Sequence, residues 1–303
     1  MPMPDPFEAL RTAPTPIDPD HAFAARLRAR VVRALLTSQG DLNVTLQATD
    51  TANRLRQGDI SFLSLWVADV QRASMFFSSV LGWTYTDNGP GDSRQVNGLA
   101  ISHGISELRS AGDFMRRLGV PLPAQIEPTA YAVHVVDNIN ASVERVRAAG
   151  GWAGAPLQQP YGLVAACLDD QAMPFTLHEV PAGLPAPRPP ATGGRHGDVA
   201  YLVFETPDST RARAFLGSVF GLQFAPGRSQ DGWNIPEMVP MSGLSGGHAR
   251  ATIVPMYRVD NIQAAVERVR AAGGTSTDPV VEPYGTRAEC VDDQGTRFML
   301  GQF

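Results

Sequence analysis

The sequence predicts an α+β fold built from two tandem copies of one domain, preceded by an N-terminal helix. The nine residues VERVRAAGG begin at Val143 and recur without change at Val266, a spacing of 123 residues (266 − 143 = 123). An Asp-Asp-Gln triplet at Asp169 recurs at Asp292 with the same spacing (292 − 169 = 123). A constant spacing across separate motifs indicates an internal repeat. The length of 303 residues also favours two domains, because it exceeds what one hydrophobic core usually spans.

The repeat and the local composition divide the chain into four segments. These are an N-terminal helix and connector (1–57), a first repeat copy (58–182), a Pro-rich linker (183–196) and a second copy (197–303). The linker region reads PAGLPAPRPPATGGR. So many prolines are typical of a stiff, extended spacer between domains.

The segment before the repeats has no second copy in the chain. Asp18 can cap a helix that starts at Pro19 and ends near Gly40, and apolar residues recur at every fourth position on one face of it. An amphipathic helix of this kind must dock on another surface. We expect it to pack against the repeats or against a second subunit, so the sequence leaves open a homodimer formed through this helix.

Each repeat copy opens with a strand followed by a helix, ISFLSLWVADVQRASMFFSSVLGW in the first and DVAYLVFETPDSTRARAFLGSVFGL in the second. Asp69 and Asp208 are placed to cap these helices, and Gly82 and Gly221 to end them. The two aspartates are 139 residues apart (208 − 69 = 139), so the first copy holds 16 extra residues (139 − 123 = 16) before Asp137. We expect the insertion within HGISELRSAGDFMRRLGVPLPAQIEP, either as a lid or as a surface loop.

Each copy continues with a second strand and helix and closes with a hairpin. The VERVRAAGG helix has inward valines and outward Glu and Arg, and it should end at Gly150 or Gly273. The Asp-Asp-Gln turn then joins two alternating strands. Cys167 and Cys290 occupy the same place in the two copies, within apolar strands. We expect both to be small buried side chains and not a disulfide or a zinc site.

Composition limits the classes of partner. A net charge of −5 and a pI near 5.7 argue against a sequence-independent grip on nucleic acid, which needs clustered Lys and Arg. No apolar run is long enough to span a membrane, and the N-terminus lacks the pattern of a secretion signal. We therefore expect a cytoplasmic protein whose partner is a small organic molecule, with no nucleic-acid or membrane partner.

The ordered elements resemble a known superfamily. SLWVADVQRASMFFSSVLGW and VVDNINASVERVRAAGG, followed by DDQAMPFTLHEV, are similar to the two halves of a vicinal oxygen chelate domain. This superfamily includes glyoxalases, extradiol dioxygenases and bleomycin resistance proteins, and the second repeat copy resembles it equally. The resemblance covers about residues 59–303. It implies that each copy consists of two βαβββ units whose curved mixed sheets enclose a cleft.

The resemblance also implies where a metal would be bound. Members that use a metal carry ligands early in the first strand of a unit and late in its last strand, as His and Glu. Counting seven residues back from the Asp after each opening strand gives the first kind of position, and the closing strands give the second: Phe62, Ala130, Tyr201, Ile253, Thr176 and Met299. None offers an imidazole or a carboxylate. We therefore predict no metal site, no cofactor and a role that leans away from enzyme.

Alternation along the strands predicts the residues that line the clefts, since side chains two apart share a face. The predicted cleft residues are aromatic, apolar and a few polar ones: Ser64, Trp66, His134, Thr176, His178, Tyr201, Glu205, Trp233, Tyr257 and Met299. Several of them could equally fill a collapsed core. His134 and His178, expected on one face, are the candidates for acid–base catalysis. His103 and His248, in loops, could reach a cleft mouth.

Three functional hypotheses follow. The leading one is a metal-free protein of the bleomycin-resistance type that binds a small aromatic or polycyclic molecule by apolar burial. The second is an enzyme. It could be a metal-free one that uses His134 or His178, or a glyoxalase-like lyase, isomerase or dioxygenase with an unrecognised metal site. The third is an interaction protein whose clefts are filled and whose N-terminal helix binds a partner.

Overall fold

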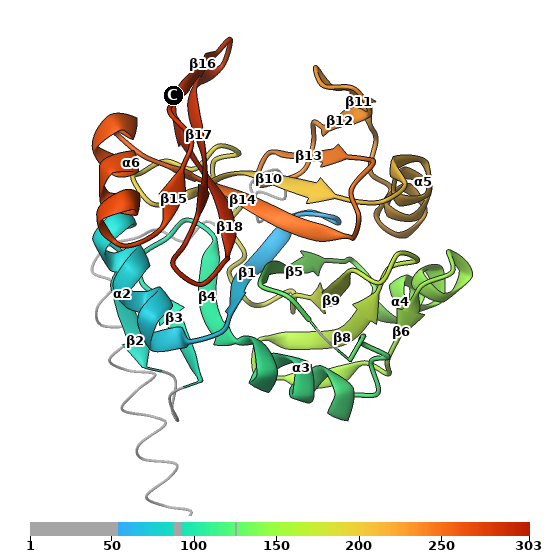
Figure 1. Cartoon of the computed structure of the whole chain (residues 1–303). Coiled ribbons are helices and arrows are strands. Elements are labelled where there is room, and N and C mark those ends of the chain that lie inside the picture. Colours follow the sequence, from blue (N-terminus) through green and yellow to red (C-terminus); the bar gives the residue numbers. More distant parts are fainter. Residues whose placement is uncertain (1–53, 88–91, 125) are drawn as a thin grey trace, which may run out of the picture. The chain divides into compact units, whose positions relative to one another are not determined.

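A computed structural model describes residues 54–87, 92–124 and 126–303, all within one compact unit (Figure 1). The predicted N-terminal helix, and with it the homodimer through that helix, lies outside the described residues. The described chain folds into two mixed sheets of nine strands each, one per repeat copy, with five helices. The predicted α+β class with two tandem domains is therefore confirmed.

The first sheet has the strand order β2-β3-β4-β1-β5-β9-β8-β6, and β7 pairs with β8. Its strands are β1 (Ile60–Val67), β2 (Tyr85–Asp87), β3 (Ser93–Val96), β4 (Ser102–Glu107), β5 (Thr129–Val135), β6 (Trp152–Ala153), β7 (Leu157–Gln159), β8 (Gly162–Leu168) and β9 (Pro174–Glu179). β1 is parallel to β4 and antiparallel to β5, and β5 is parallel to β9. Two βαβββ units thus meet at the β1–β5 pair.

The second sheet repeats this topology in the order β11-β12-β13-β10-β14-β18-β17-β15, and β16 pairs with β17. Its strands are β10 (Val199–Glu205), β11 (Ala225–Pro226), β12 (Gly232–Ile235), β13 (Ser242–Ser245), β14 (Thr252–Arg258), β15 (Thr275–Ser276), β16 (Val280–Glu282), β17 (Gly285–Val291) and β18 (Arg297–Gln302).

The five helices are α2 (Val70–Leu81), α3 (Leu108–Arg117), α4 (Ile139–Ala148), α5 (Ser209–Phe220) and α6 (Ile262–Ala271). Asp69 and Asp208 cap α2 and α5 as predicted, because their side chains accept hydrogen bonds from first-turn amides. In α4 and α6 the cap is an asparagine, Asn138 or Asn261. Each asparagine directly follows the aspartate, Asp137 or Asp260, from which the cleft positions of that unit were predicted.

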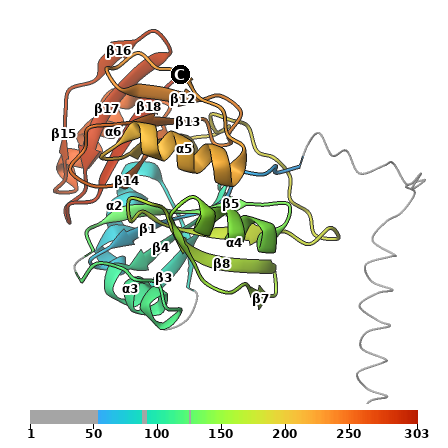
Figure 2. The ribbon, with the colours of Figure 1, turned by 90° about the vertical axis from the view of Figure 1, so that its right-hand side faces the viewer.

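The two domains share one hydrophobic core. Apolar residues of α2, α4, α5 and α6 pack there with alternate residues of both sheets. α2 of the first domain lies beside α6 of the second (Figure 1), and α4 lies beside α5 (Figure 2). Each sheet therefore has one face that bears two helices and lies in the shared core.

The repeated VERVRAAGG motif belongs to this contact between domains. Arg145 donates to the carbonyl oxygen of Val219 near the end of α5 (2.9 Å), and Arg268 donates in the same way to that of Val80 in α2 (3.0 Å). A Cβ on Gly151 would lie 2.8 Å from Phe215 of the other domain. Each copy of the motif thus binds the end of a helix of the other domain.

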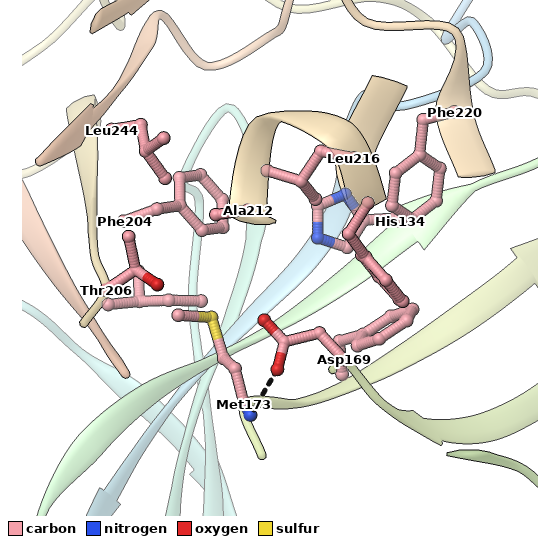
Figure 3. Close-up of a pocket in the computed structure, with 12 residues that line it drawn as sticks. His134, Asp169, Met173, Phe204, Thr206, Ala212, Leu216, Phe220 and Leu244 are labelled. Atoms are coloured by element: carbon pink, nitrogen blue, oxygen red, sulfur yellow. Dashed lines mark hydrogen bonds between the residues drawn. The ribbon is translucent and has the colours of Figure 1, made fainter. Parts of the chain in front are cut away.

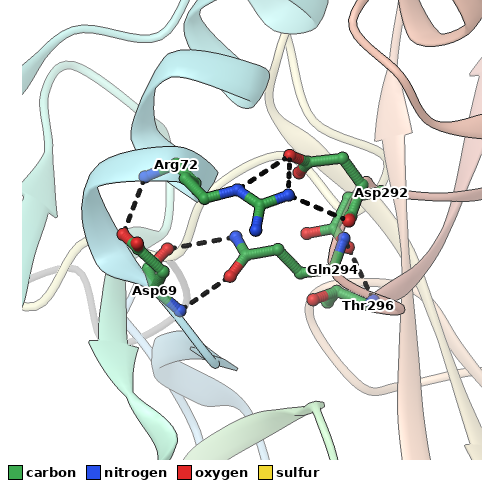
Figure 4. A network of polar contacts seen from close by, with 6 residues as sticks. Asp69, Arg72, Asp292, Gln294 and Thr296 are labelled. Atoms are coloured by element: carbon green, nitrogen blue, oxygen red, sulfur yellow. Dashed lines mark hydrogen bonds and ion pairs between the residues drawn. The ribbon is translucent and has the colours of Figure 1, made fainter.

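The Asp-Asp-Gln turns bind the N-terminal ends of α2 and α5, and Figure 4 shows the contact at α2. The amide of Asp69 donates to Gln294 Oε1 (2.7 Å), and Gln294 Nε2 donates back to the carbonyl of Asp69 (3.0 Å). Arg72 binds Asp293 at 2.7 Å. The same arrangement joins the turn of the first domain to the start of α5, where the side chain of Gln171 exchanges two hydrogen bonds with the backbone of Asp208.

The insertion in the first domain forms α3, within the segment where the sequence placed it. Met115 of α3 packs with Trp66, Tyr131 and Ala166 in a second cluster that is separate from the shared core. α3 thus covers the face of the first sheet opposite to α2 and α4, which we call the α3 face.

The Pro-rich linker folds back onto the domains and does not stand free as a spacer. Arg188 donates two hydrogen bonds to the buried carboxylate of Asp59 (2.8 and 3.1 Å), and Pro187 forms a β-bridge with Arg54. Asp59 also accepts from the amide of Val239 in the second domain (2.9 Å). A charge-assisted contact of this kind fixes the path of the linker.

Two smaller expectations concern the cysteines and membrane spans. Cys167 and Cys290 are free and buried, and burial raises the pKa of Cys167 to about 12 and that of Cys290 to about 11. Neither thiol is therefore available as a thiolate nucleophile. No helix among the described residues has the length and apolar character needed to cross a bilayer.

Candidate functional site

The second sheet has a face on which no described residue forms a helix. We call it the helix-free face. Five apolar residues from three strands form its floor: Tyr201 and Val203 of β10, Val254 and Met256 of β14, and Met299 of β18. Val254, Met256 and Met299 are buried, whereas Tyr201 and Val203 are only partly so. This floor is separate from the core that the domains share.

The corresponding face of the first sheet is filled. Trp66 and Tyr131 stack with ring centroids 4.6 Å apart, and the Tyr131 hydroxyl contacts Met115 Sδ of α3 at 3.7 Å. The second domain has only the residues between Ser245 and Thr252 where the first domain has α3. The insertion therefore decides which of the two equivalent faces is occupied by the protein itself.

The outer hairpins of the second sheet approach one another beside this face. The guanidinium of Arg228, in the β11–β12 loop, lies 5.4 Å from the ring centroid of Tyr284, in the β16–β17 turn. The rings of Tyr284 and Phe303 are 6.3 Å apart, and both side chains are exposed. β11 and β16 belong to opposite ends of the sheet, so their approach shows that the sheet is curved.

A polar cluster adjoins the apolar floor at one end. Arg297 binds both carboxylate oxygens of Glu205, at 2.6 and 2.8 Å. His248 Nδ1 lies 3.4 Å from Glu205 Oε2, and His248 Nε2 lies 3.0 Å from Ser245 Oγ. The Glu205 side chain is only 9% exposed, and the ion pair with it raises the pKa of Arg297. A carboxylate held in this way has a fixed direction.

Seven of the ten predicted cleft residues lie on the α3 face or the helix-free face: Ser64, Trp66, Thr176, His178, Tyr201, Glu205 and Met299. The first three belong to the face that α3 fills, and the Thr176 hydroxyl contacts that of Tyr131. Tyr201, Glu205 and Met299 come together on the helix-free face. These three predicted residues of the second domain therefore lie on the face that no helix of the described residues covers.

His134 is a correction, because it lies on the opposite face, in the shared core. Its ring stacks on Phe220 of the other domain with centroids 4.6 Å apart, and Nδ1 lies 3.2 Å from the Gly58 oxygen. Burial lowers the pKa of His134 to about 4. His178 faces the other way and contacts Ser61 Oγ at 3.0 Å. The two histidines therefore do not form the pair that the sequence suggested.

Tyr257 and Trp233 are corrections of the same kind. Tyr257 is buried in the shared core, where its hydroxyl lies 3.0 Å from Nε2 of His103. Trp233 packs on the helix-bearing side, with the guanidinium of Arg213 of α5 at 3.6 Å from its ring centroid. His103, expected in a loop, lies in β4 and is a core side chain, whereas His248, in the loop after β13, does reach the polar cluster.

The error at His134 and Tyr257 has one cause. The predicted positions lie seven residues before Asp137 and Asp260, but the helix caps are Asn138 and Asn261. Because strand side chains alternate, a shift of one residue exchanges the two faces.

Counting from the true caps gives Tyr131 and Val254, which do face away from the shared core. With this correction the positions that the resemblance assigns to metal ligands are Phe62, Tyr131, Thr176, Tyr201, Val254 and Met299. None is a His, Asp, Glu or Cys, the donors that such a divalent metal requires. Elsewhere among the described residues, no group of three such side chains is placed to hold a metal ion. The residues at these positions do not fit a metal.

A small cavity lies between the domains (Figure 3). Its volume is about 20 Å³, and it is lined by side chains of both domains, including His134, Asp169 and Thr206. Burial raises the pKa of Asp169 to about 6, although its carboxylate accepts hydrogen bonds from two backbone amides. The Thr206 hydroxyl has no hydrogen-bond partner among the residues that the structure describes. This space has room for about one water molecule and is too small for an organic ligand.

Comparison with known proteins gives the class of the fold. The chain has the vicinal oxygen chelate fold in two tandem domains. The solved structure of a catechol 2,3-dioxygenase matches 82% of the chain and 88% of its own length, with a TM-score of 0.55 and 12% identity. The Mn(II)-bound glyoxalase from Novosphingobium aromaticivorans covers 82% of each chain, with a TM-score of 0.57 and 13% identity.

The 2,3-dioxygenase LapB from Pseudomonas sp. KL28 matches 83% of the chain and 93% of its own length, with a TM-score of 0.57 and 11% identity. In sequence, the chain is 26% identical over 264 residues to the anthracycline biosynthesis protein DauV of Streptomyces sp. (strain C5), covering 82% of this chain and 94% of that protein. No protein-family model matches the chain.

Sequence reasoning missed two members of the polar cluster, Ser245 and Arg297. A signal for Arg297 was present, because it lies two residues before Met299 on the same strand and so shares its face. Ser245 pairs with Glu205 across parallel strands, a register that only the sheet topology supplies.

Proposed function

We propose that this protein binds a small planar aromatic or polycyclic molecule against the helix-free face of the second sheet, in the cytoplasm and without a metal. One contrast carries the proposal. α3 occupies the equivalent face of the first sheet, whereas the face of the second keeps an apolar floor that no helix of the described residues covers. Ligand sites combine such a floor with a few fixed polar groups, and the cluster of Glu205 and Arg297 supplies these.

The floor suits a flat ligand. Tyr201 is partly exposed and can stack on an aromatic ring, and Val203 and Met299 offer apolar contact beside it. Tyr284 and Phe303 are exposed at the rim formed by the outer hairpins. The relative from Streptomyces supports this ligand class, because its name assigns it to anthracycline biosynthesis and anthracyclines are polycyclic aromatic compounds.

The second candidate is an enzyme. The solved structures of similar fold include dioxygenases and a glyoxalase, but the corresponding positions in this chain lack metal donors. We therefore favour an activity that uses the side chains of the polar cluster over one that uses a bound metal. Elemental analysis of the purified chain tests this part: a stoichiometric first-row metal would contradict the metal-free proposal.

The binding proposal is tested by titrating the full chain with doxorubicin as a fluorescent anthracycline probe. We expect saturable binding that Val203→Trp weakens by at least about tenfold, because the indole fills the floor. Tyr201→Ala should weaken binding by a similar factor through loss of stacking. The matched control is Met75→Trp, which adds the same side chain at a position that is 57% exposed in α2 of the first domain.

Circular dichroism and thermal melting of each variant show whether it is folded. The proposal fails if the chain shows no saturable binding, or if folded Val203→Trp and Tyr201→Ala bind the probe as tightly as the original chain.

A further inference from the structure

We propose that Ser245, His248 and Glu205 form a serine–histidine–carboxylate triad that cleaves carboxylic esters at the edge of the helix-free face. Ser245 Oγ lies 3.0 Å from His248 Nε2, and His248 Nδ1 lies 3.4 Å from Glu205 Oε2. This is the order of contacts in which the histidine activates a serine hydroxyl while a carboxylate orients the ring. The second contact is longer than a hydrogen bond, as such contacts often are without substrate.

Arg297 fixes the third member of the triad. Its two bonds to Glu205 leave Oε2 within reach of the imidazole, and they compensate the charge of a carboxylate that is largely buried. We assign Arg297 a positioning role, because it acts through Glu205.

Backbone contacts hold the segment that carries Ser245 and His248. The amide of Thr206 donates to the Ser245 carbonyl (2.9 Å), and the amides of Gly247 and His248 donate to the carbonyls of Pro207 and Thr206 (3.2 Å each). The strand end of β13 and the loop after it are thus tied to the strand end of β10. The geometry of the triad is therefore set by main-chain structure and not by one side chain alone.

The triad lies where a ligand on the floor would meet it. Glu205 follows Val203 by two residues on β10, and Arg297 precedes Met299 by two on β18, so each polar residue shares a face with a floor residue. Ser245 is the partner of Glu205 across the β10–β13 pair. Ser245 and His248 are partly exposed and so can be reached by a substrate.

The chemistry balances without a metal or a cofactor. Ser245 Oγ attacks the ester carbonyl while His248 Nε2 takes its proton, and the tetrahedral intermediate collapses as the imidazolium gives that proton to the departing alcohol. Water then attacks the acyl-serine in the same way, which releases the carboxylic acid and restores the serine. The expectation that the ester carries an aromatic group rests on the proposed function, whereas the triad itself does not.

The first domain supplies a matched control. Ser106 occupies the place of Ser245, since Ser106 pairs with Trp66 as Ser245 pairs with Glu205. Trp66 stands there in place of the carboxylate, and Ser64 Oγ, at 3.1 Å, contacts the Ser106 hydroxyl. Ser106 therefore has the strand position of Ser245 without the acid of the triad.

The test treats the full chain with a fluorophosphonate probe, which labels activated serines, and measures intact mass and the labelled peptide. We expect one adduct per chain, at Ser245. Ser245→Ala should abolish labelling, and His248→Ala should slow it at least about 100-fold. Glu205→Gln should slow it less, and Ser106→Ala should leave it unchanged. Hydrolysis of 4-nitrophenyl acetate should follow the same order.

The proposal is overturned if the folded chain is not labelled, if the adduct lies on another residue, or if folded Ser245→Ala hydrolyses the ester at the original rate. Its failure is distinguishable from failure of the binding proposal. A folded chain that is labelled at Ser245 but does not bind doxorubicin contradicts the binding proposal alone, and a folded chain that binds doxorubicin but is not labelled contradicts the triad alone.

Discussion

Asp169 shows how a single residue of the repeat acquires a different environment in the tertiary structure. Its oxygen accepts hydrogen bonds from the amides of Gln171 and Met173, which the turn requires. It also lines the cavity between the domains, and burial there raises its pKa to about 6. The ionised form is therefore less favourable in the folded chain than in the unfolded one.

This pKa gives a pH-dependent prediction for Asp169→Asn, which keeps the acceptor oxygen. The ordinary aspartate pKa is about 3.9. Because the folded pKa is raised, the free energy of unfolding of the original chain should fall as pH rises from about 4 to about 6. The variant has no carboxyl group at this position and should not show this fall. Above pH 7 the variant should be more stable by about 1–2 kcal/mol.

Urea unfolding of both chains at pH 4.5, 5.5 and 7.5 measures the difference. A difference in unfolding free energy that stays constant over this range would show that the carboxyl of Asp169 is not shifted in the folded chain.

Among the elements, α3 has the largest consequence for function. It is the element that the 16-residue insertion adds, and it fills one of two otherwise equivalent faces. Met115 and Phe114 are neighbours on α3 with opposite surroundings. Met115 is 3% exposed and Phe114 is 53% exposed.

Met115→Ala should lower the free energy of unfolding by about 2–4 kcal/mol, because it removes buried methylene groups and leaves a cavity beside Trp66 and Tyr131. Phe114→Ala is the control and should change it by less than about 0.5 kcal/mol. Chemical denaturation followed by tryptophan fluorescence measures both values. Equal effects of the two substitutions would contradict the packing of α3 against the first sheet.

The elements also show where sequence patterns lose accuracy. The caps at Asp69 and Asp208 were predicted because an aspartate before an apolar helix is a local signal. In the second units an Asp-Asn pair offers two candidate caps, and the choice of Asn over Asp reverses the face of β5 and β14. One residue of uncertainty at a helix start was enough to misplace His134 and Tyr257.

At the scale of the whole molecule, the repeat motifs join the two domains into one body. At Gly151 the packing between the two domains leaves no room for a side chain. A Cβ there would lie 2.5 Å from the carbonyl oxygen of Leu168 and 2.8 Å from Phe215 of the second domain. Gly274 has the same surroundings with Phe76 of the first domain.

Gly151→Ala should destabilise the described body as a whole, by about 2 kcal/mol or roughly 4–8 °C in Tm, because neither the backbone oxygen nor the packed ring can move freely. We expect one calorimetric transition, shifted to lower temperature, since the domains share a core. Gly183→Ala is the control, because nothing lies within 4 Å of that Cβ. Two separate transitions would show that the domains unfold independently.

The sequence by itself determined the features that depend on neighbouring residues and on repetition. These include the α+β class, the two tandem domains, the helix caps at Asp69 and Asp208, the position of the insertion and the burial of Cys167 and Cys290. Periodicity and capping are local properties, and a duplication is visible as a constant spacing.

Only the tertiary structure decided which face is covered and which polar side chains meet. α3 fills the first face through contacts with residues on three separate strands, and no pattern within α3 specifies them. Glu205, Ser245, His248 and Arg297 span more than ninety residues of the chain and converge through the register of β10 with β13 and the turn before β18. Contacts between distant residues depend on the packing of whole elements, which the local pattern of a chain does not encode.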